Sequence, residues 1–461
     1  MMYMRTPGHG SAWLPAALLG AGLVTAVVVS GTAVSGTGVA APAAAPHRAG
    51  TTAHHAGTGA MAPGAGTQAI AHRAGTAAGA AAPAEAADRA VRLQALLGQH
   101  SVLAADLMRS RIRGDDDFVQ AANAALGKNT DAMTELTGQL FGAEAGRTFG
   151  PMWSEHVVSV VDYAAALADE DDGALDHARE ELVEYEEDLA DFFAGASQGR
   201  LTPAAARAAV GMHVDHLTGQ ADAYAAGDYA TADRLYRTGY GHAYDMGAAL
   251  ADALLPAADR ATLRVPVWRL RSQLGKLLAE HAVLVEEVTR AAVTNSPDFD
   301  AAAEMINANT RALASAMDTL FGAPAAKQFQ SVWGSHVEQL VAYGAGAAAK
   351  DTGRQDRARA GLAAAEQQLA TFLGAATGHR ISDAALAAAL LEHDRMLLQH
   401  ADAYGARDYA AAHDLAYRTY DHMFALAKTL ADAFGSTVAA RLPRGGAKTG
   451  FGGLAGGTGG R

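Results

Sequence analysis

The stretch 140–163, LFGAEAGRTFGPMWSEHVVSVVDY, returns at 320–343 as LFGAPAAKQFQSVWGSHVEQLVAY, an offset of 180 residues. A second stretch, ADAYAAGDYA at 221–230, returns as ADAYGARDYA at 401–410 with the same offset. The chain therefore contains two copies of one unit and supplies its own two-member alignment. Most of the surrounding sequence has changed between the copies, so the positions that both retain are the first guide to what the protein must keep.

Both copies predict helix from end to end. Runs rich in Ala, Leu, Glu and Arg are interrupted by Gly, Pro and Asp, and β-branched alternation is nearly absent. The first copy divides into predicted helices at about 87–112, 116–140, 145–168, 174–196, 203–226 and 228–254. Short loops between helices of this length indicate antiparallel neighbours in a bundle. We therefore predict an all-α fold with two homologous helical bundles of about six helices each in tandem, at 88–256 and 267–436.

Residues that favour helix ends support these boundaries. The stretches 115–117 and 296–298 offer N-cap oxygens, and Thr202 precedes Pro203, which suits a first helical turn. Gly142 and Gly322 suit the left-handed position after a helix end. The link at 257–265 is too short for a free swivel. We therefore expect the bundles to share an interface, as a pseudo-twofold or side-by-side pair.

The two ends of the chain lack the helical pattern. Arg5 precedes an apolar run from Ala12 to Val29, and small residues follow, with plausible cleavage after Ser35 or Ala40. This order is typical of a secretory signal, with an uncleaved anchor as the alternative, so we assign 1–40 to a signal peptide or anchor and expect a secreted or extracytoplasmic protein. Residues 41–86, rich in Ala, Gly and His, and the Gly-rich 437–461 predict a disordered spacer and tail.

Composition excludes several classes of function. The chain carries 36 Lys and Arg against 49 Asp and Glu, a net charge of −13, and no basic cluster. It is therefore a poor candidate for binding nucleic acid or anionic lipid, and we expect membrane contact only through an uncleaved anchor. Cysteine is absent, which excludes disulfides, thiolate catalysis, Fe–S clusters and covalently attached haem.

Four histidines persist in each copy. They are separated by 56, 57 and 29 residues in the first copy and by 55, 57 and 29 in the second. Steps of this size place them near the middle of the first, third, fifth and sixth helices, and therefore at one level of an antiparallel bundle. The predicted metal ligands are His100, His156, His213 and His242 in the first copy and His281, His336, His393 and His422 in the second.

Imidazole ligands suit Zn, Cu, Fe and Ni. The chain has neither the Glu-x-x-His pattern of ferritin-like di-iron centres nor the His-Glu-x-x-His of zinc metalloproteases. The extracytoplasmic prediction and the repeated Tyr and Trp favour copper first and zinc second, with haem between two histidines a distant third. A structural network of histidine and aromatic side chains remains the alternative to a metal site.

Other positions are also retained in both copies. Asn129 and Asn309 could hold a ligand imidazole or form an interhelical hydrogen bond. The repeated Trp153/Trp333 and Tyr163/Tyr343 predict core aromatics, and Asp228/Asp408 predict helix caps. A further set of histidines has no partner in the other copy, which argues against a shared ligand role: His177, His216, His379, His400 and His413.

The pattern Trp-x-x-His-x-x-x-x-x-x-Tyr, with Tyr240-Gly-His242 and Tyr420-Asp-His422, resembles secreted tandem-repeat helical proteins of high-GC and other Gram-positive bacteria. Some similar chains carry the label copper amine oxidase. That label implies a large β-sandwich and a quinone made from the Tyr of Asn-Tyr-Asp/Glu. No Asn-Tyr pair occurs in this sequence. The resemblance therefore supports copper binding but not that reaction.

Three functions remain open from sequence alone. The retained histidines favour an extracytoplasmic metal-binding protein that stores, buffers or senses copper or zinc, with one site per copy. The first alternative is a non-catalytic cell-surface module with a polar histidine core and a protein partner that the sequence does not identify. The second is a metal-dependent oxidase or hydrolase, which lacks support because the two copies share neither a nucleophile–base pair nor paired acid/base carboxylates.

Overall fold

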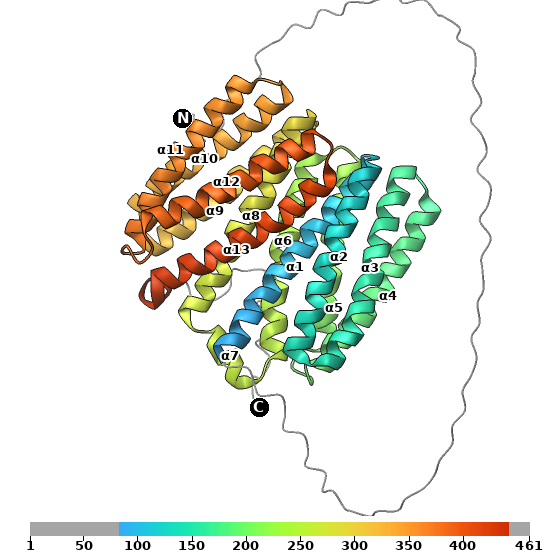
Figure 1. The fold of residues 1–461 in the computed structure, drawn as a ribbon. Coiled ribbons are helices and arrows are strands. Elements are labelled where there is room, and N and C mark those ends of the chain that lie inside the picture. The colour runs from blue at the N-terminus through green and yellow to red at the C-terminus, as the bar shows by residue number, and fades with distance from the viewer. Residues whose placement is uncertain (1–82, 442–461) are drawn as a thin grey trace, which may run out of the picture. The chain divides into compact units, whose positions relative to one another are not determined.

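The computed structural model describes residues 83–441, and this part of the chain contains thirteen α-helices and no strand (Figure 1). The all-α prediction is confirmed. The helices are α1 (Pro83–Ile112), α2 (Asp116–Phe141), α3 (Ala143–Asp169), α4 (Asp172–Ala196), α5 (Pro203–Ala225), α6 (Tyr229–Leu254), α7 (Ala257–Leu263), α8 (Pro266–Thr294), α9 (Phe299–Phe321), α10 (Ala323–Ala348), α11 (Thr352–Ala376), α12 (Asp383–Gly405) and α13 (Tyr409–Ala439).

The boundaries differ from the sequence prediction in three places. Helix α1 begins at Pro83, inside the predicted spacer. The α13 span reaches Ala439, but non-helical Gly435 (φ 76°, ψ 174°) interrupts it next to the predicted end at 436. The predicted link contains α7, a seven-residue helix with no buried side chain. Two turns are too short to show an apolar period, so the sequence pattern could not reveal this helix.

The predicted signal segment (1–40), the spacer up to residue 82 and the tail from residue 442 lie outside the described residues. Across 83–441, none of the helices has an apolar stretch of the length needed to span a bilayer. Secretion and membrane attachment therefore stay predictions that rest on the sequence.

Several predicted helix ends have the expected local chemistry. The Thr202 hydroxyl accepts a hydrogen bond from the Ala205 amide at 3.2 Å, as an N-cap should. Gly142 and Gly322 have positive φ angles of 104° and 89°, which a side chain would strain, but their ψ angles of 153° and 164° differ from the predicted left-handed helical conformation. Asp298 is a partial exception. It stands at the N-cap position of α9, but its side chain makes no cap hydrogen bond.

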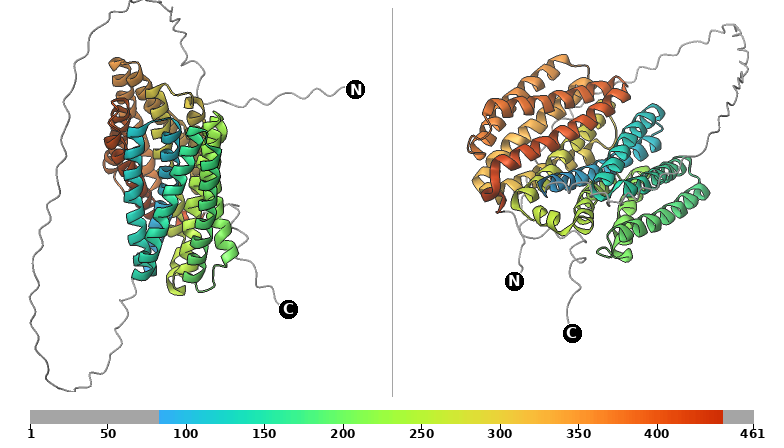
Figure 2. Two further views of the ribbon diagram at one scale, coloured as in Figure 1. Left: turned by 90° about the vertical axis from the view of Figure 1, so that its right-hand side faces the viewer. Right: turned by 60° about the horizontal axis from the view of Figure 1, so that its bottom comes forward.

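The helices form two halves of equivalent construction, half 1 (α1–α6) and half 2 (α8–α13). In half 1 the central helix α1 packs against α2, α3, α5 and α6, and in half 2 the central helix α8 packs against α9, α10, α12 and α13. The pairs α3–α4 and α10–α11 lie at opposite outer edges of the helical body (Figure 1). Figure 2, left, shows the half 1 helices running nearly along one direction. A residue in the middle of α1 or α8 is therefore enclosed by helices.

Equivalent elements also meet where the halves touch. Helix α1 contacts α8, α2 contacts α13, and α6 contacts α9, as a pseudo-twofold axis requires. Tyr240 and Tyr420 occupy equivalent positions, and their hydroxyls lie 3.5 Å apart. Tyr240 donates to the Lys276 carbonyl of half 2, and Tyr420 donates to the Ala95 carbonyl of half 1, each at 2.8 Å. The pseudo-twofold arrangement expected from the repeat is present.

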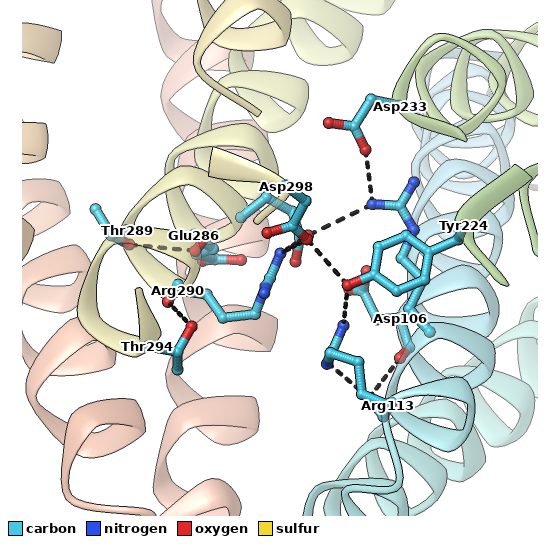
Figure 3. A network of polar contacts seen from close by, with 12 residues as sticks. Asp106, Arg113, Tyr224, Asp233, Glu286, Thr289, Arg290, Thr294 and Asp298 are labelled. Atoms are coloured by element: carbon cyan, nitrogen blue, oxygen red, sulfur yellow. Dashed lines mark hydrogen bonds and ion pairs between the residues drawn. The ribbon is translucent and has the colours of Figure 1, made fainter. Parts of the chain in front are cut away.

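A network of buried charges crosses this interface. Arg109 of half 1 pairs with Asp233 at 2.9 Å and approaches Glu287 of half 2 at 3.6 Å. Figure 3 shows Arg290 and the Tyr224 hydroxyl converging on the Asp298 carboxylate from opposite sides, at 2.5 and 3.0 Å. Because such charges are costly to bury unless paired, this network fixes how the halves meet.

Candidate metal centre

Three retained histidines of half 1 meet in its interior. His100 of α1, His156 of α3 and His213 of α5 are at most 1% exposed. The Nε2 atoms of His100 and His156 lie 2.9 Å apart, and the ring centre of His213 lies 5.4 Å from that of His100. One ring nitrogen from each of the three falls within 4.8 Å of the others. We call this group the first triad.

Half 2 repeats the arrangement. His281 of α8, His336 of α10 and His393 of α12 are at most 1% exposed, and one nitrogen from each lies within 4.8 Å of the others. The Nε2 atoms of His281 and His336 are 3.3 Å apart. We call this group the second triad. Two nitrogens bound to one tetrahedral ion at ~2.0 Å are separated by about 3.3 Å, which matches the His281–His336 pair. The His100–His156 pair, at 2.9 Å, is at hydrogen-bond distance, so an ion in the first triad would replace that hydrogen bond.

The protonation of His156 is fixed by its neighbour. Its Nδ1 lies against the Trp153 carbonyl oxygen, which can only accept a hydrogen bond. Nδ1 therefore carries the proton, and Nε2 presents its lone pair to the triad. A ring oriented through its second nitrogen in this way is the usual arrangement of a metal-binding histidine.

Other ring nitrogens of the triads are buried without a hydrogen-bond partner. Both nitrogens of His213 and both of His393 are in this state, as are Nδ1 of His100 and of His281. Burying a polar group without a partner costs about 1–3 kcal/mol. The unpartnered nitrogens belong to equivalent histidines in the two halves, His100 and His281 and also His213 and His393. This repetition favours a bound group over accidental packing.

Aromatic side chains close each triad. The Trp153 ring lies 4.5 Å from that of His100, and the Trp333 ring lies 4.6 Å from that of His281. Both tryptophans are also core residues, as their repetition predicted. Large apolar rings beside the imidazoles exclude water, which strengthens any electrostatic interaction inside the triad.

The imidazoles of the first triad are neutral. Burial lowers the pKa of His100 and His213 well below the ordinary value, and neighbouring histidines add to the effect. Burial lowers the pKa of His156 to about 3, against the opposing hydrogen bond to Trp153. Since metal ions bind the neutral ring, none of the three has to lose a proton first near neutral pH.

Two carboxylates accompany the second triad. His336 Nδ1 lies 2.8 Å from a Glu366 oxygen and 3.4 Å from an Asp394 oxygen. Both acids are at most 3% exposed, and with His336 they form a second possible ligand group. Burial lowers the pKa of His336, but the charges of Asp394 and Glu366 outweigh burial and raise it.

Sequence reasoning missed these two acids for a definite reason. Position 394 is Asp in the second copy but Val214 in the first, so a search for shared residues removes it. Glu366 does have a counterpart, Glu186, which belongs to the acidic stretch 180–188 assigned to the surface. The available signal was an acidic residue directly after His393, a retained histidine.

The remaining retained histidines lie outside the triads. His242 Nε2 and His422 Nε2 each lie 2.9 Å from a backbone carbonyl oxygen, of Ala209 and Ala389 respectively. The carbonyl accepts from the ring, so Nε2 of each carries a proton and is turned away from metal binding. The structure thus brings three of the four predicted ligands together in each half, and a role for the fourth stays a prediction.

The retained asparagines bridge helices. Asn129 Nδ2 donates to the Leu96 carbonyl at 3.0 Å and to the Gln99 side chain at 3.1 Å. Asn309 Nδ2 donates to the Leu277 carbonyl at 3.0 Å and to Glu280 at 2.7 Å. Of the two readings left open, these contacts match the interhelical hydrogen bond.

The remaining retained positions have structural contacts. Tyr163 and Tyr343 donate to Asp222 and Asp402. The predicted caps are present, since the Asp228 and Asp408 side chains accept from the backbone amides of Thr231 and Ala411. These residues hold the helices that carry the triads.

The histidines without a counterpart are scattered. His177 and His379 are 72% and 70% exposed at the side chain, and each lies near an acidic residue one helical turn away. His216 packs near His242, while His400 and His413 are buried beside the interface between the halves. None of the five belongs to a three-ligand group among the described residues.

Comparison of the chain with known protein families, with curated proteins and with solved structures found no match. The site must therefore be interpreted from its own geometry.

Proposed function

We propose that this protein binds metal ions, one in each half, through His100, His156 and His213 and through His281, His336 and His393. The carrying observation is that three buried imidazoles converge in both halves, and that the ring nitrogens of His213 and His393 have no other partner. Imidazole suits both copper and zinc. Copper is the first candidate ion and zinc the second, on the predicted extracytoplasmic location and the repeated Tyr and Trp. Haem stays the least favoured group.

Burial argues for holding an ion rather than for catalysis. The triad side chains are at most 1% exposed, so an ion bound there is shielded from solvent and from substrate. Catalytic metal sites keep an open position for water or substrate. Together with the predicted secretory segment, this supports storage, buffering or sensing of copper or zinc outside the cytoplasm.

The test is elemental analysis of the full chain, produced with trace metals and purified without a histidine tag. We expect two equivalents of metal per chain. His213→Leu and His393→Leu should each reduce this to one, and the double variant to none. Leu removes two unpartnered nitrogens and leaves no new unpaired group, so the fold should survive each change, which circular dichroism would confirm.

His242→Gln is the matched control, because the Gln amide can replace the hydrogen bond to the Ala209 carbonyl. We expect this variant to retain two equivalents. Loss of one equivalent would instead support a four-histidine site. Absence of metal from the purified chain, even after titration with cuprous, cupric and zinc ions, would overturn the proposal and favour a structural histidine core.

A further inference from the structure

The two triads have the same three imidazoles but different electrical surroundings. At the position after the third histidine, half 1 has Val214 and half 2 has Asp394. On the neighbouring helix, half 1 has Tyr185 where half 2 has Ala365. These two differences decide what charge lies next to the bound ion.

In half 1 the side of the triad toward α4 is closed by an uncharged ring. Tyr185 stacks on His156 with the ring centres 4.4 Å apart and the planes 12° apart. The next residue, Glu186, is only partly buried and belongs to no ligand group. The described part of half 1 therefore offers an ion three neutral imidazoles and no carboxylate.

In half 2 the small Ala365 stands in place of the Tyr185 ring, and Glu366 is buried against His336. The side chains of Glu366 and Asp394 are 1% and 5% exposed. None of their four oxygens has a hydrogen bond of good geometry, and His336 is the cation-forming group beside both. When both acids are ionised, they place two negative charges beside one imidazole, and a bound cation neutralises this excess.

The cost of burying an ion rises with the square of its charge in the Born treatment, so a divalent ion costs about four times as much as a monovalent one. Three neutral imidazoles leave the full charge of the ion in place, whereas two carboxylates, once ionised, cancel the charge of a divalent ion. Copper is available as a monovalent ion and zinc is not. The charge of the surroundings therefore discriminates between these ions where the ligands alone do not.

We propose that the two sites are divided by charge, with the second triad taking a divalent ion such as Zn²⁺ and the first triad taking monovalent Cu⁺. This inference rests on the proposed function. Glu366 acts as a positioning residue, because it lies at His336 Nδ1 while Nε2 faces the triad. A carboxylate partner makes an imidazole a stronger ligand for a divalent ion than does the neutral carbonyl that holds His156.

The experiment isolates each site in the full chain. His393→Leu leaves the first triad alone, and His213→Leu leaves the second. Zn²⁺ affinity would be measured against a chromophoric zinc chelator, and Cu⁺ affinity against a cuprous chelator without oxygen. We expect the His213→Leu protein to bind Zn²⁺ at least 10-fold more tightly than the His393→Leu protein, with the order reversed for Cu⁺.

Two further variants assign the difference to the carboxylates. Adding Glu366→Gln and Asp394→Asn to the His213→Leu protein should weaken Zn²⁺ binding about 10- to 100-fold and leave Cu⁺ binding unchanged or tighter. Adding Tyr185→Ala and Val214→Asp to the His393→Leu protein should strengthen Zn²⁺ binding in the first triad.

Equal Zn²⁺ affinities of the two single-site proteins would overturn the division by charge while leaving metal binding intact. Unchanged Zn²⁺ affinity after Glu366→Gln and Asp394→Asn would do the same. Absence of either ion from both single-site proteins would overturn the proposed function itself. The two single-site proteins keep all four residues that distinguish the sites, so their comparison decides the matter even where a further substitution prevents folding.

Discussion

Half 1 and half 2 use one scaffold to surround the same three imidazoles with different chemistry. Tyr185 covers His156 in half 1, whereas Glu366 reaches the equivalent His336 in half 2. Glu366 has a glutamate counterpart in half 1, Glu186, so the acid was available in both copies. In half 2 the residue before Glu366 is the small Ala365, where half 1 has Tyr185. The comparison teaches that two copies with the same three imidazoles can differ in the charge that lies beside them.

The interface shows a second version of the same divergence. Arg109 and Arg290 occupy equivalent positions of α1 and α8, and Asp106 and Glu287 lie one turn earlier on the same helices. Both arginines are retained and buried, but their partners differ, with Asp233 beside Arg109 and Asp298 beside Arg290. Paired positions therefore allow the halves to be compared by equivalent substitutions.

The largest expected effect comes from removing these arginines. Arg109→Leu leaves the buried Asp233 without its cationic partner, and Arg290→Leu leaves Asp298 with the Tyr224 hydroxyl but without a cation. Breaking a buried ion pair on one side costs about 3–5 kcal/mol. We expect each variant to lose that much free energy of unfolding, measured by urea denaturation at neutral pH.

Arg395→Leu provides the control, because Arg395 pairs with Glu392 at the surface with 47% of its side chain exposed. Its replacement should leave the free energy of unfolding nearly unchanged, because a solvent-exposed ion pair contributes little to stability. A loss below about 1 kcal/mol for either buried arginine would contradict the view that the network holds the halves together.

Tyr185→Ala should have the next largest effect, because it removes a buried ring from His156 in half 1. Truncating a buried aromatic residue to Ala costs about 3 kcal/mol. Tyr185→Phe should be neutral or slightly stabilising, since the Tyr185 hydroxyl is buried without a hydrogen-bond partner. Urea denaturation of the metal-free protein measures the free energy of unfolding of both variants. A clear loss of stability in Tyr185→Phe would show that the hydroxyl contributes to stability, contrary to this prediction.

The repeat made the fold and the three-histidine level predictable. Helical periodicity and short loops specify antiparallel helices, and the nearly equal spacing of His100, His156 and His213 specifies one height. Rotation about the helix axis was less well specified. His242 stands on a helix at the predicted position, but its ring is directed to the Ala209 carbonyl, outside the first triad.

Charge placement could not be predicted from sequence in the same way. Asp298 resembles a helix cap in sequence, but its carboxylate is used by Arg290 and Tyr224. Glu366 and Asp394 lie on helices whose turns bring them to His336, a relation that depends on packing across three helices. Such contacts arise from tertiary structure, so neither periodicity nor retention reveals them.

Asp106 and Glu287 allow a comparison by pH. Burial, together with the charge of Glu287, raises the pKa of Asp106 to about 8. An unfolded Asp titrates near ~3.9, so the folded chain holds one more proton than the unfolded chain between about pH 4 and 8. The contribution of Asp106 to the free energy of unfolding is therefore fully present below about pH 4. It falls as the pH rises through that window, by up to about 1.4 kcal/mol per pH unit.

Asp106→Asn should remove this loss, so the variant should exceed the wild-type protein in urea midpoint at pH 8 and match it near pH 4. Glu287→Gln should instead lower the midpoint at pH 8, because Glu287 lies 3.6 Å from Arg109 and 3.2 Å from Arg290. Parallel responses of the two variants would contradict the assignment of different roles to these equivalent positions.

The smallest expected effect lies on the pseudo-twofold axis, where Tyr240 and Tyr420 each donate to a carbonyl of the opposite half. Tyr240→Phe and Tyr420→Phe should each cost about 0.5–1 kcal/mol, because one neutral hydrogen bond is lost while ring packing is kept. Since the hydroxyls lie 3.5 Å apart, the double variant should depart from the sum of the single losses. If the two single variants lose equal free energy of unfolding in urea, the halves have diverged at the triads and in the charge network but not at the axis. Unequal losses would show that the axis has diverged as well, and that its symmetric geometry conceals different energies.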